Sequence, residues 1–360
     1  MNILVLPGDG IGPEVVAEAI RVLQVIGIRY GHKFEFTPGH IGASAIKQHG
    51  NPLPAKTINQ LGNAHATLLG AVGGVDPRPG EPRPEEGLLR LRQELGLFAN
   101  IRPVKLFDAL ADAGPLKPEV VRGSDFVIVR ELLGGLYFGQ PKQRIENTRG
   151  QRAVDTMAYT DKQIERLVRY GFTMAQSRRG KLHSVDKRNV LETSRLWHDV
   201  TVEVAEEFPD VKVEHMLVDN AAMQLMLNPR QFDVIVTENT FGDILSDEAG
   251  VVASSPGMLP SASLAIKSRR RGQRHGLYEP IHGAAPDIAN RNIANPLAAI
   301  LSAAMMLELS FNLPEAKQAI EAAVAAVLAA GYRTKDIMVP SCMEVTTSQM
   351  GTLVVERLKE

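Results

Sequence analysis

The stretch "FDVIVTENTFGDILSDEAG", residues 232–250, joins a strand pattern to a helix pattern. Its first part, "FDVIVTE", is an apolar run that ends in a charged residue, as expected of a buried strand. Its second part places Asp243 and Asp247 four residues apart, and residues at this spacing share one face of a helix. The stretch therefore predicts a strand that leads directly into a helix with two carboxylates on one side.

Two interpretations of this carboxylate pair are open. Like charges at this separation repel each other unless a positive charge lies between them, and a bound cation would supply that charge. The alternative is a solvated acidic face with an N-terminal cap, because acidic residues are favoured in the first turn of a helix. This stretch alone does not decide between a metal site and an ordinary helix start.

Strand and helix patterns alternate along the rest of the chain. Short apolar runs predict strands at residues 2–7, 66–74, 125–131 and 181–187. Apolar residues at helical spacing predict helices at residues 13–26, 160–180 and 190–208, and a mostly helical segment from Asn295 onward. The helix that starts near Thr160 or Asp161 would bury a face made of Ile164, Leu167, Val168, Gly171, Phe172 and Ala175. This alternation predicts an α/β fold with a mostly parallel sheet and helical crossovers.

Three segments are predicted to be turns or loops. "GDGIG", residues 8–12, has the spacing GxGxG instead of the GxGxxG of a Rossmann site, so it predicts a tight turn where a ligand could approach the backbone. "GVDPRPGEPRPEEG", residues 74–87, is rich in proline and glycine. "KSRRRGQRHG", residues 267–276, is basic but lacks aromatic residues that would stack on nucleic-acid bases, so a solvated loop is expected.

The composition is that of an ordinary globular protein. The 360 residues are 44% hydrophobic and 22% charged, which predicts two domains or one large α/β domain. A net charge of −1 argues against nucleic acid and membrane surfaces as partners. The single cysteine, Cys342, excludes an internal disulfide and indicates a reducing compartment. The N-terminal run reads as a strand, and no apolar run is long enough to span a membrane, so we expect a cytoplasmic protein.

Arginine residues occur near the ends of predicted strands. Arg130 ends an apolar strand, Arg102 follows the strand-like run "FANI", and Arg92 lies in "LLRLRQEL". Ligands bind at the carboxyl ends of parallel strands, and arginine binds carboxylates in a planar, bidentate way. Several arginines in such positions indicate a small substrate with more than one carboxylate.

Three further residues could hold or relay protons. Lys187 ends one strand, Asp219 ends another in "HMLVDNAAM", and Tyr137 lies in "GGLYFGQ", where glycines allow a sharp turn. Each of them alone also has a structural interpretation. Asp219, for example, could cap a helix that starts at Asn220.

Several ordered segments carry a resemblance to a known family. They include "LPGDGIGPE", "EEGLLRLRQELGLFANIRP", "VRELLGGLYFG", "SVDKRNVLE", "VDNAAMQL", "ENTFGDILSDEAG" and "YEPIHGAAPDIA". The chain resembles the β-decarboxylating dehydrogenases, the family of isopropylmalate, isocitrate, homoisocitrate and tartrate or D-malate dehydrogenases. The resemblance implies a two-domain, non-Rossmann, isopropylmalate/isocitrate dehydrogenase-like fold. Residues 1–98 and 254–360 would form the cofactor-binding domain, and residues 99–253 a central domain for substrate, metal and dimer contacts.

The resemblance also implies an activity. It is strongest to the isopropylmalate branch, which implies NAD-dependent oxidative decarboxylation of (2R,3S)-3-isopropylmalate to 4-methyl-2-oxopentanoate and CO₂ in leucine biosynthesis. Two alternatives stay open. The substrate could be another 3-substituted malate, D-malate, tartrate or isocitrate. The chain could also be a catalytically silent regulatory or binding protein on the same scaffold.

The family's catalytic groups carry over onto residues of this sequence. By resemblance, Asp243 and Asp247 bind Mg²⁺ or Mn²⁺ together with Asp219 of the partner subunit in a homodimer that shares its active sites. Lys187 of the partner subunit would take the substrate hydroxyl proton, and Tyr137 would help to protonate the enol carbon. The substrate's carboxylates would be held by Arg92, Arg102 and Arg130.

The resemblance assigns side-chain and cofactor contacts as well. The stretch "EEGLLRLR", residues 85–92, should form a helix that faces the substrate. By resemblance, Leu88 and Leu89 would line the pocket for the isopropyl group, and Glu85 would lie near the nicotinamide of NAD. The adenosine would be wrapped by His282, Gly283, Ala284 and Ala285, with Asp287 at the ribose hydroxyls and Asn295 at the adenine. The basic segment at residues 267–276 departs from the tight turn of many bacterial relatives, which puts the conformation of the following cofactor loop in doubt.

Overall fold

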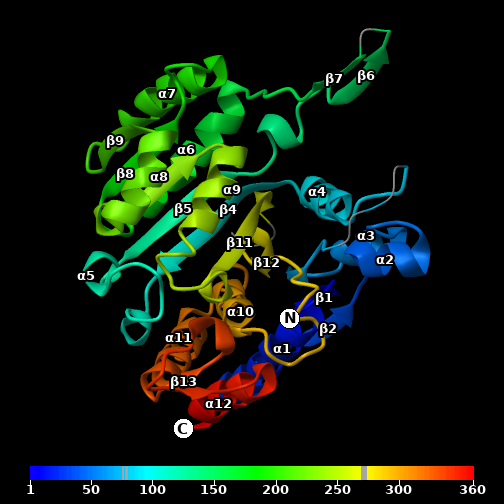
Figure 1. Cartoon of the computed structure of the whole chain (residues 1–360), viewed down its shortest axis with the longest axis vertical. Helices are drawn as coiled ribbons and strands as arrows, with labels where there is room; N and C mark the ends of the chain where they lie inside the picture. Colours follow the sequence, from blue (N-terminus) through cyan, green and yellow to red (C-terminus); the bar gives the residue numbers. More distant parts are fainter. Residues whose placement is uncertain (75–76, 78–79, 149, 269–273) are drawn as a thin grey trace. The chain divides into compact units, whose positions relative to one another are not determined.

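The chain folds into two compact units. The computed structural model describes residues 1–74, 77, 80–148, 150–268 and 274–360 (Figure 1). The terminal unit consists of Met1–Leu97, Leu106–Arg122 and Ala253–Glu360. The central unit consists of Phe98–Lys105 and Gly123–Val252. Residues 106–122 thus group with the two chain ends, and the roles predicted for the two domains stay predictions.

The terminal unit contains a mostly parallel run of strands. Strand β1 pairs in parallel with β2 and β3, β3 pairs in parallel with β12, and β12 pairs antiparallel with β11. A separate short parallel pair is formed by β13 and β14. The bounds are β1 Asn2–Gly8, β2 Glu35–Pro38, β3 Ala66–Ala71, β11 Pro260–Ser268, β12 Arg274–Pro280, β13 Tyr332–Arg333 and β14 Met343–Glu344.

The central unit repeats this arrangement. Strands β5, β10, β8 and β9 are parallel neighbours in that order, and β4 pairs antiparallel with β5. Strands β6 and β7 form an antiparallel hairpin of their own. The bounds are β4 Leu97–Lys105, β5 Asp125–Glu131, β6 Gln143–Asn147, β7 Gly150–Val154, β8 Lys181–Asp186, β9 Lys212–Leu217 and β10 Val234–Thr237.

Helix α10 is the core of the terminal unit. Nearly all of its residues are buried, and it packs on β11, β12, α1 and α11, which explains its uniformly apolar sequence. The helices of this unit are α1 Gly12–Tyr30, α2 Gly42–His49, α3 Ala55–Leu61, α4 Pro84–Leu95, α5 Pro118–Val121, α10 Leu297–Leu309, α11 Pro314–Ala329 and α12 Thr347–Lys359. Its 3₁₀ turns include η1 Asp108–Leu110, η4 Pro256–Met258 and η6 Lys335–Ile337. Of the described helices, none is both long and apolar enough to cross a membrane.

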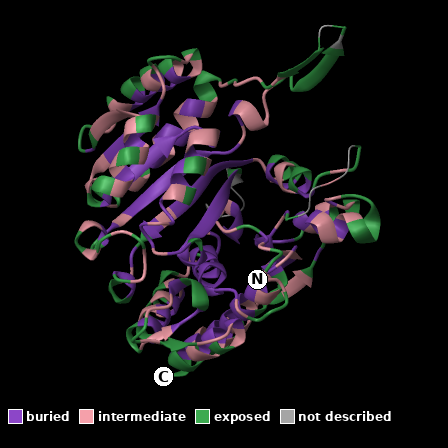
Figure 2. Ribbon diagram, in the orientation of Figure 1, coloured by how far each residue is buried: buried purple, intermediate pink, exposed green. Residues whose placement is uncertain are grey.

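The helices of the central unit are amphipathic and cover buried strands (Figure 2). Helix α6 starts with a capping box at Thr160, and all six residues predicted for its apolar face are buried, so that prediction is confirmed. The helices and 3₁₀ turns are α6 Asp161–Gln176, α7 Glu192–Ala205, α8 Val218–Leu227, α9 Asn239–Glu248, η2 Gly135–Tyr137 and η3 Pro229–Gln231.

Two loop predictions are wrong in part. The segment 74–87 is not a loop throughout, because α4 begins at Pro84, where proline in the first turn and the acidic Glu85 and Glu86 favour a helix start. The segment 267–276 begins and ends inside strands, since β11 runs to Ser268 and β12 starts at Arg274. Residues 75–76, 78–79 and 269–273 of these two predictions lie outside the described residues.

Candidate active site

Helix α9 carries the two carboxylates of the opening stretch. Strand β10 ends at Thr237, and Glu238 caps α9 by accepting a hydrogen bond from the backbone N–H of Phe241 at 2.5 Å. Asp243 and Asp247 therefore lie in the middle and the last turn of the helix. The interpretation of this pair as part of a helix start is wrong, because Glu238 is the capping residue and neither aspartate lies in the first turn.

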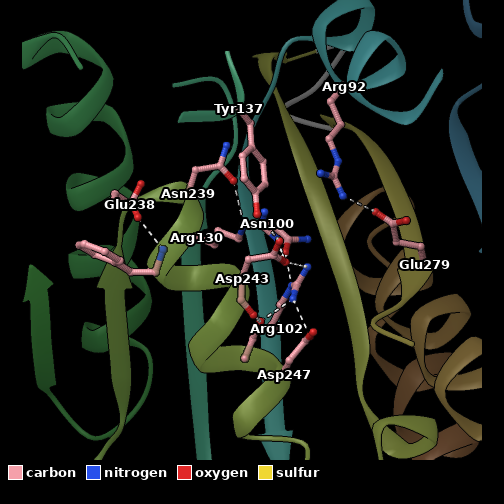
Figure 3. Close-up of polar contacts among 12 residues, drawn as sticks. Arg92, Asn100, Arg102, Arg130, Tyr137, Glu238, Asn239, Asp243, Asp247 and Glu279 are labelled. Atoms are coloured by element: carbon pink, nitrogen blue, oxygen red, sulfur yellow. Dashed lines mark hydrogen bonds and ion pairs between the residues drawn. The ribbon is translucent and has the colours of Figure 1, made fainter. Parts of the chain in front are cut away.

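Two guanidinium groups and a phenol surround Asp243 (Figure 3). Arg130 forms an ion pair with Asp243 Oδ1, and Arg102 Nη2 lies 3.4 Å from the same oxygen. Tyr137 donates its hydroxyl proton to Asp243 Oδ2 at 2.8 Å. Arg102 Nη1 also lies 3.6 Å from Asp247 Oδ1. These cations offset the repulsion between the two carboxylates.

Arg130 is held tightly at the end of β5. Its side chain is 1% exposed, and its guanidinium carbon lies 5.7 Å from the centre of the Tyr137 ring. Its aliphatic stem packs on α9 where Gly242 has no side chain, since a Cβ there would lie 2.6 Å from Arg130 Cγ. The end of a parallel strand and a glycine on the facing helix together place this cation beside Asp243.

Arg102 reaches the same cluster by a different route. It lies inside β4 and not at a strand end, so the strand-end prediction is wrong for this residue. Because β4 runs antiparallel to β5, with Asn100 opposite Arg130, the interior of one strand lies beside the end of the other. Arg102 Nε donates to Asn100 Oδ1 at 2.5 Å, and its Nη1 donates to the hydroxyl of Ser246.

Tyr137 ends the 3₁₀ turn η2, which follows β5. The buried carboxylate of Glu131 holds this turn by accepting hydrogen bonds from the backbone N–H groups of Leu133 and Gly134, the latter at 2.6 Å. Burial, and then the negative charge of Asp243, raise the pKa of Tyr137 to about 12. The phenol is therefore protonated at neutral pH and able to donate.

Lys187 and Asp219 form a second polar pair in the central unit. Lys187 directly follows β8, and its Nζ donates to Asp219 Oδ1 at 2.5 Å. This hydrogen bond holds the pKa of Asp219 below its usual range. The alternative that Asp219 caps a helix starting at Asn220 is wrong, because α8 starts at Val218 and has no side-chain cap.

The carboxylate donors suit a hard divalent cation, which prefers oxygen ligands. Asp243 and Asp247 share one face of α9, and the Asp247 side chain is 69% exposed. Within the described part of the chain, no group of three or more histidine, cysteine, aspartate or glutamate side chains is placed to hold a metal ion. The remaining ligands of a metal ion at Asp243 and Asp247 would therefore come from another chain, from the substrate or from water.

Helix α4 carries four predicted site residues in the terminal unit. Arg92 is buried and its Nη2 lies 3.3 Å from Glu279 Oε1, near the end of β12. It lies in α4, so the helix predicted for the stretch "EEGLLRLR" is confirmed. Leu88 and Leu89 are half-buried and Glu85 is exposed, one to two helical turns before Arg92.

The predicted cofactor loop follows β12 and contacts the "GDGIG" turn. The backbone N–H of Ile11 donates to the carbonyl of Ala284 at 2.8 Å, and a Cβ on Gly10 would lie 1.8 Å from that oxygen. His282 Nε2 is buried without a hydrogen-bond partner among the described residues, and burial lowers the pKa of this imidazole. A neutral ring with a free nitrogen suits an uncharged polar group such as adenosine. Gly283 and Asp287 are exposed, and Ala285 has φ 40°.

The far end of this loop is anchored by residues that the sequence did not indicate. Glu14 of α1 accepts hydrogen bonds from the backbone N–H groups of Asn290 at 3.0 Å and Asn292 at 2.8 Å. The predicted adenine contact, Asn295, donates to Asp336 Oδ2 at 3.0 Å. The loop is thus fixed to the rest of the terminal unit at both ends.

Sequence reasoning also missed the polar residues that hold the central cluster. Asn100 and Ser246 bind Arg102, and Glu238 and Asn239 lie at the start of α9. A signal was available for the last two, because both directly follow an apolar strand, as ligand-binding residues do in parallel sheets.

Comparison with known proteins identifies the family. The profile described as isocitrate/isopropylmalate dehydrogenase matches residues 2–354. The chain belongs to the isocitrate/isopropylmalate dehydrogenase family. It is 60% identical to a 3-isopropylmalate dehydrogenase of Bacillus subtilis (strain 168), over 93% of this chain and 91% of that protein. It is 56% identical to one of Moorella thermoacetica (strain ATCC 39073 / JCM 9320), over 100% of this chain and 99% of that protein.

Solved structures of the isocitrate/isopropylmalate dehydrogenase family share the fold. An isocitrate dehydrogenase from Methylococcus capsulatus has a TM-score of 0.88 at 33% sequence identity, covering 100% of this chain and 99% of that chain. The α/β fold with a mostly parallel sheet, predicted from the alternation of strand and helix patterns, is confirmed, and so is the resemblance to this family. The chain is an enzyme, a decarboxylating dehydrogenase of this family.

Proposed function

We propose that the protein catalyses the NAD-dependent oxidative decarboxylation of (2R,3S)-3-isopropylmalate in leucine biosynthesis. The observation that carries this proposal is the cluster around Asp243, in which two buried arginines and a protonated tyrosine meet a carboxylate on one helix face. Relatives named 3-isopropylmalate dehydrogenase at 53–60% identity support the choice of substrate. The prediction of a cytoplasmic location stays a prediction.

The alternatives have less support. The isocitrate dehydrogenase of similar structure is 33% identical, well below the relatives named for isopropylmalate. A catalytically silent scaffold protein would not need to retain the whole set of acid, base and carboxylate-binding residues. Here Lys187, Tyr137, Arg102, Arg130 and Asp243 are all present.

A divalent metal ion, Mg²⁺ or Mn²⁺, fits the carboxylates of α9. We propose that Asp243 and Asp247 hold it, with Asp219 of the partner subunit as a third ligand. When bound, such an ion acts as a Lewis acid that polarises a hydroxyl or carbonyl oxygen and stabilises negative charge on it. With the ion bound, Arg102 and Arg130 could bind the substrate's carboxylates as well as the carboxylate of Asp243.

The chain's own residues supply the binding and acid–base groups. Arg102 and Arg130 orient the substrate through its carboxylates, and Arg92 is proposed as a further carboxylate-binding residue. Lys187 accepts the hydroxyl proton, directly or through water, and Asp219 orients its amine at 2.5 Å. Tyr137 keeps its proton at neutral pH, since its pKa is raised to about 12, and donates it to the carbon from which CO₂ leaves.

The cofactor proposal rests on the loop after β12. NAD, when bound, accepts the hydride removed from the substrate's hydroxyl-bearing carbon. The partnerless Nε2 of His282 and the exposed carboxylate of Asp287 are available to an adenosine and its ribose hydroxyls. Asn295, whose amide donates to Asp336 Oδ2, is proposed to contact the adenine, and Glu85 on α4 is proposed to lie near the nicotinamide.

A homodimer is supported by an exposed apolar face of the central unit. Met223 and Leu227 of α8 are 53% and 62% exposed, and Ile244 of the neighbouring α9 is 62% exposed. Asp219, Met223 and Leu227 are spaced four residues apart and so share one face of α8. Among the described residues, no third strand pairs with the hairpin of β6 and β7, and a lone two-stranded hairpin is marginally stable in water. A second copy of this chain would cover both features and bring Asp219 to the partner's site.

The function is tested by following NADH formation with isopropylmalate and Mg²⁺. We expect turnover that stops when a chelator is added and returns with excess Mg²⁺. A lack of turnover with isopropylmalate, combined with turnover of isocitrate or D-malate, would replace the proposed substrate but keep the family chemistry.

Substrate selectivity should follow the apolar side chains of α4. We expect kcat/KM to decrease in the order isopropylmalate, smaller alkylmalates, D-malate and isocitrate. A methylene group in such a pocket contributes about 1–3 kcal/mol, so the isopropyl group should give an advantage of at least about a hundredfold over D-malate. Leu88 and Leu89 offer the third carboxylate of isocitrate no hydrogen bond, and burying it unpaired is costly.

The matched variant for this prediction is Leu88→Ala. It should lower kcat/KM for isopropylmalate but leave that for D-malate nearly unchanged, because D-malate lacks the group that the leucine contacts. An equal loss for both substrates would show that Leu88 acts on the fold or on Arg92 instead of on the side-chain pocket.

The cofactor preference should follow the charge of Asp287. The 2′-phosphate of NADP would face this carboxylate, and juxtaposed like charges cost several kcal/mol. At about 1.4 kcal/mol per factor of ten, we expect a preference for NAD of at least about a hundredfold in kcat/KM. The measurement compares NAD and NADP for the unmodified chain and for Asp287→Asn, which should narrow the gap. Equal use of both cofactors would instead point to Arg291, whose Nη1 lies 3.5 Å from the Asp287 carbonyl oxygen.

A further inference from the structure

Asn239, the first residue of α9, makes two side-chain hydrogen bonds in opposite directions. Its Oδ1 accepts from Arg130 Nε at 3.0 Å, and its Nδ2 donates to the carbonyl of Gly134 at 3.1 Å. The side chain is fully buried, and Figure 3 shows it beside Arg130 at the start of the helix. One amide thus connects the strand end that carries Arg130 with the turn that carries Tyr137.

We propose that Asn239 is a positioning residue that sets the orientation of Arg130 and the place of the Tyr137 turn together. The proposal rests on the proposed function of those two residues. An uncharged amide is suited to this role because it presents one acceptor and one donor at fixed relative positions. A carboxylate offers no donor, and a hydroxyl is too short to span both partners.

Gly134 and Arg130, the two residues that the Asn239 side chain binds, are also held by contacts with other residues. The N–H of Gly134 donates to Glu131 Oε2 at 2.6 Å and the N–H of Gly135 donates to the carbonyl of Ala158 at 3.0 Å, so the carbonyl of Gly134 is a further point at which the turn is attached. The Arg130 stem lies against Gly242, which leaves rotation of the guanidinium as the remaining freedom. Asn239 accepts from Nε while Asp243 accepts from Nη1, so the two residues together fix the orientation of the guanidinium.

The backbone of Asn239 is fixed independently of its side chain. Its N–H donates to the hydroxyl of Tyr159 at 3.0 Å, and this hydroxyl donates to Glu238 Oε2 at 3.0 Å. Replacing the amide alone should therefore leave the start of α9 in place. The consequence should be confined to the orientation of Arg130 and the position of the Gly135–Tyr137 turn.

Two variants separate the effect of the hydrogen bond to Arg130 from that of the hydrogen bond to Gly134. Asn239→Ala removes both hydrogen bonds, and we expect kcat/KM to fall by about a hundredfold, the loss that a displacement of about 1 Å can cause. Asn239→Asp keeps the acceptor for Arg130 but loses the donor to Gly134, so kcat should fall while KM changes less. Thr240→Val is the matched control, because the buried Thr240 hydroxyl has no hydrogen-bond partner among the described residues and its removal should not change activity.

The experiment measures kcat and KM for isopropylmalate, Kd for NAD and Tm in all three variants and the unmodified chain. A positioning role predicts a changed kcat and KM with an unchanged Kd for NAD. Asn239→Ala behaving like Thr240→Val, or losing NAD affinity in parallel with Tm, would overturn the proposal. A crystal structure of Asn239→Ala tests it without turnover: Arg130 and the Tyr137 turn should be displaced, and unchanged positions would refute it. Failure of the unmodified chain to use isopropylmalate would count against the proposed function only.

Discussion

Asp243→Asn is expected to lower kcat/KM by about a thousandfold or more while the protein still folds. Asparagine has nearly the shape of aspartate, so it can still accept hydrogen bonds from Tyr137 and Arg130. It lacks the charge that a hard cation requires, it leaves the buried guanidinium of Arg130 without its anion, and it leaves Arg102 with Asp247 as its remaining carboxylate in the cluster. At about 1.4 kcal/mol per factor of ten, this loss corresponds to about 4 kcal/mol of transition-state stabilisation.

The matched control for this prediction is Glu248→Gln. Glu248 ends the same helix, and its replacement removes the same charge without touching the cluster. It should retain activity, whereas Asp243→Asn should not recover with added Mg²⁺ or Mn²⁺. Metal binding measured by calorimetry in the presence of substrate should be lost only in Asp243→Asn. Near-normal turnover in that variant would remove Asp243 from the metal site.

Mixing two inactive variants is expected to restore activity. If each site combines Tyr137 of one chain with Lys187 of the partner subunit, a heterodimer of Lys187→Met and Tyr137→Phe contains one intact site. Each variant alone should lose about a hundredfold or more, since both remove a proton-transfer group. Random re-association gives heterodimers as half of the dimers, so the mixture should reach about a quarter of the unmodified activity. Phenylalanine keeps the ring that Arg130 covers, which limits damage to the fold.

The complementation test needs proof that chains have exchanged. Two different affinity tags allow the heterodimer to be isolated and its composition to be measured by mass spectrometry. Each variant refolded with itself provides the baseline. A pure heterodimer that is as inactive as its parents would show that Lys187 and Tyr137 act within one chain. It would also remove the reason to place Asp219 at the partner's site.

Much of the architecture could be predicted because it depends on local periodicity. The apolar run at 125–131 is β5 with the same bounds, and the apolar face of α6 was predicted residue by residue. The helix predicted at residues 85–92 is part of α4, but the loop predicted for residues 74–87 extends past the start of this helix at Pro84. Proline at the first turn of a helix costs no hydrogen bond, so the same residue type is compatible with both states.

Several candidate site residues could also be recognised from residue type and spacing alone. Carboxylates at 243 and 247 share a helix face in any helix, and Arg130 follows an apolar strand whatever surrounds it. Residue type and spacing indicated a substrate with more than one carboxylate, whereas the choice of a metal ion over a solvated acidic face came only from the family resemblance. Which arginine pairs with which carboxylate could not be predicted from residue type and spacing.

Only the tertiary structure decided that Arg102 joins Arg130 at Asp243. Arg102 lies in the interior of β4, and it reaches the cluster because β4 runs antiparallel to β5 and places Asn100 opposite Arg130. Gly242 and Asn239 likewise gain their roles from contacts with a strand more than a hundred residues away in the sequence. Periodicity along the chain specifies which face of an element is apolar. Strand register and the close approach of a helix to a distant strand depend on packing between segments, which no local pattern encodes.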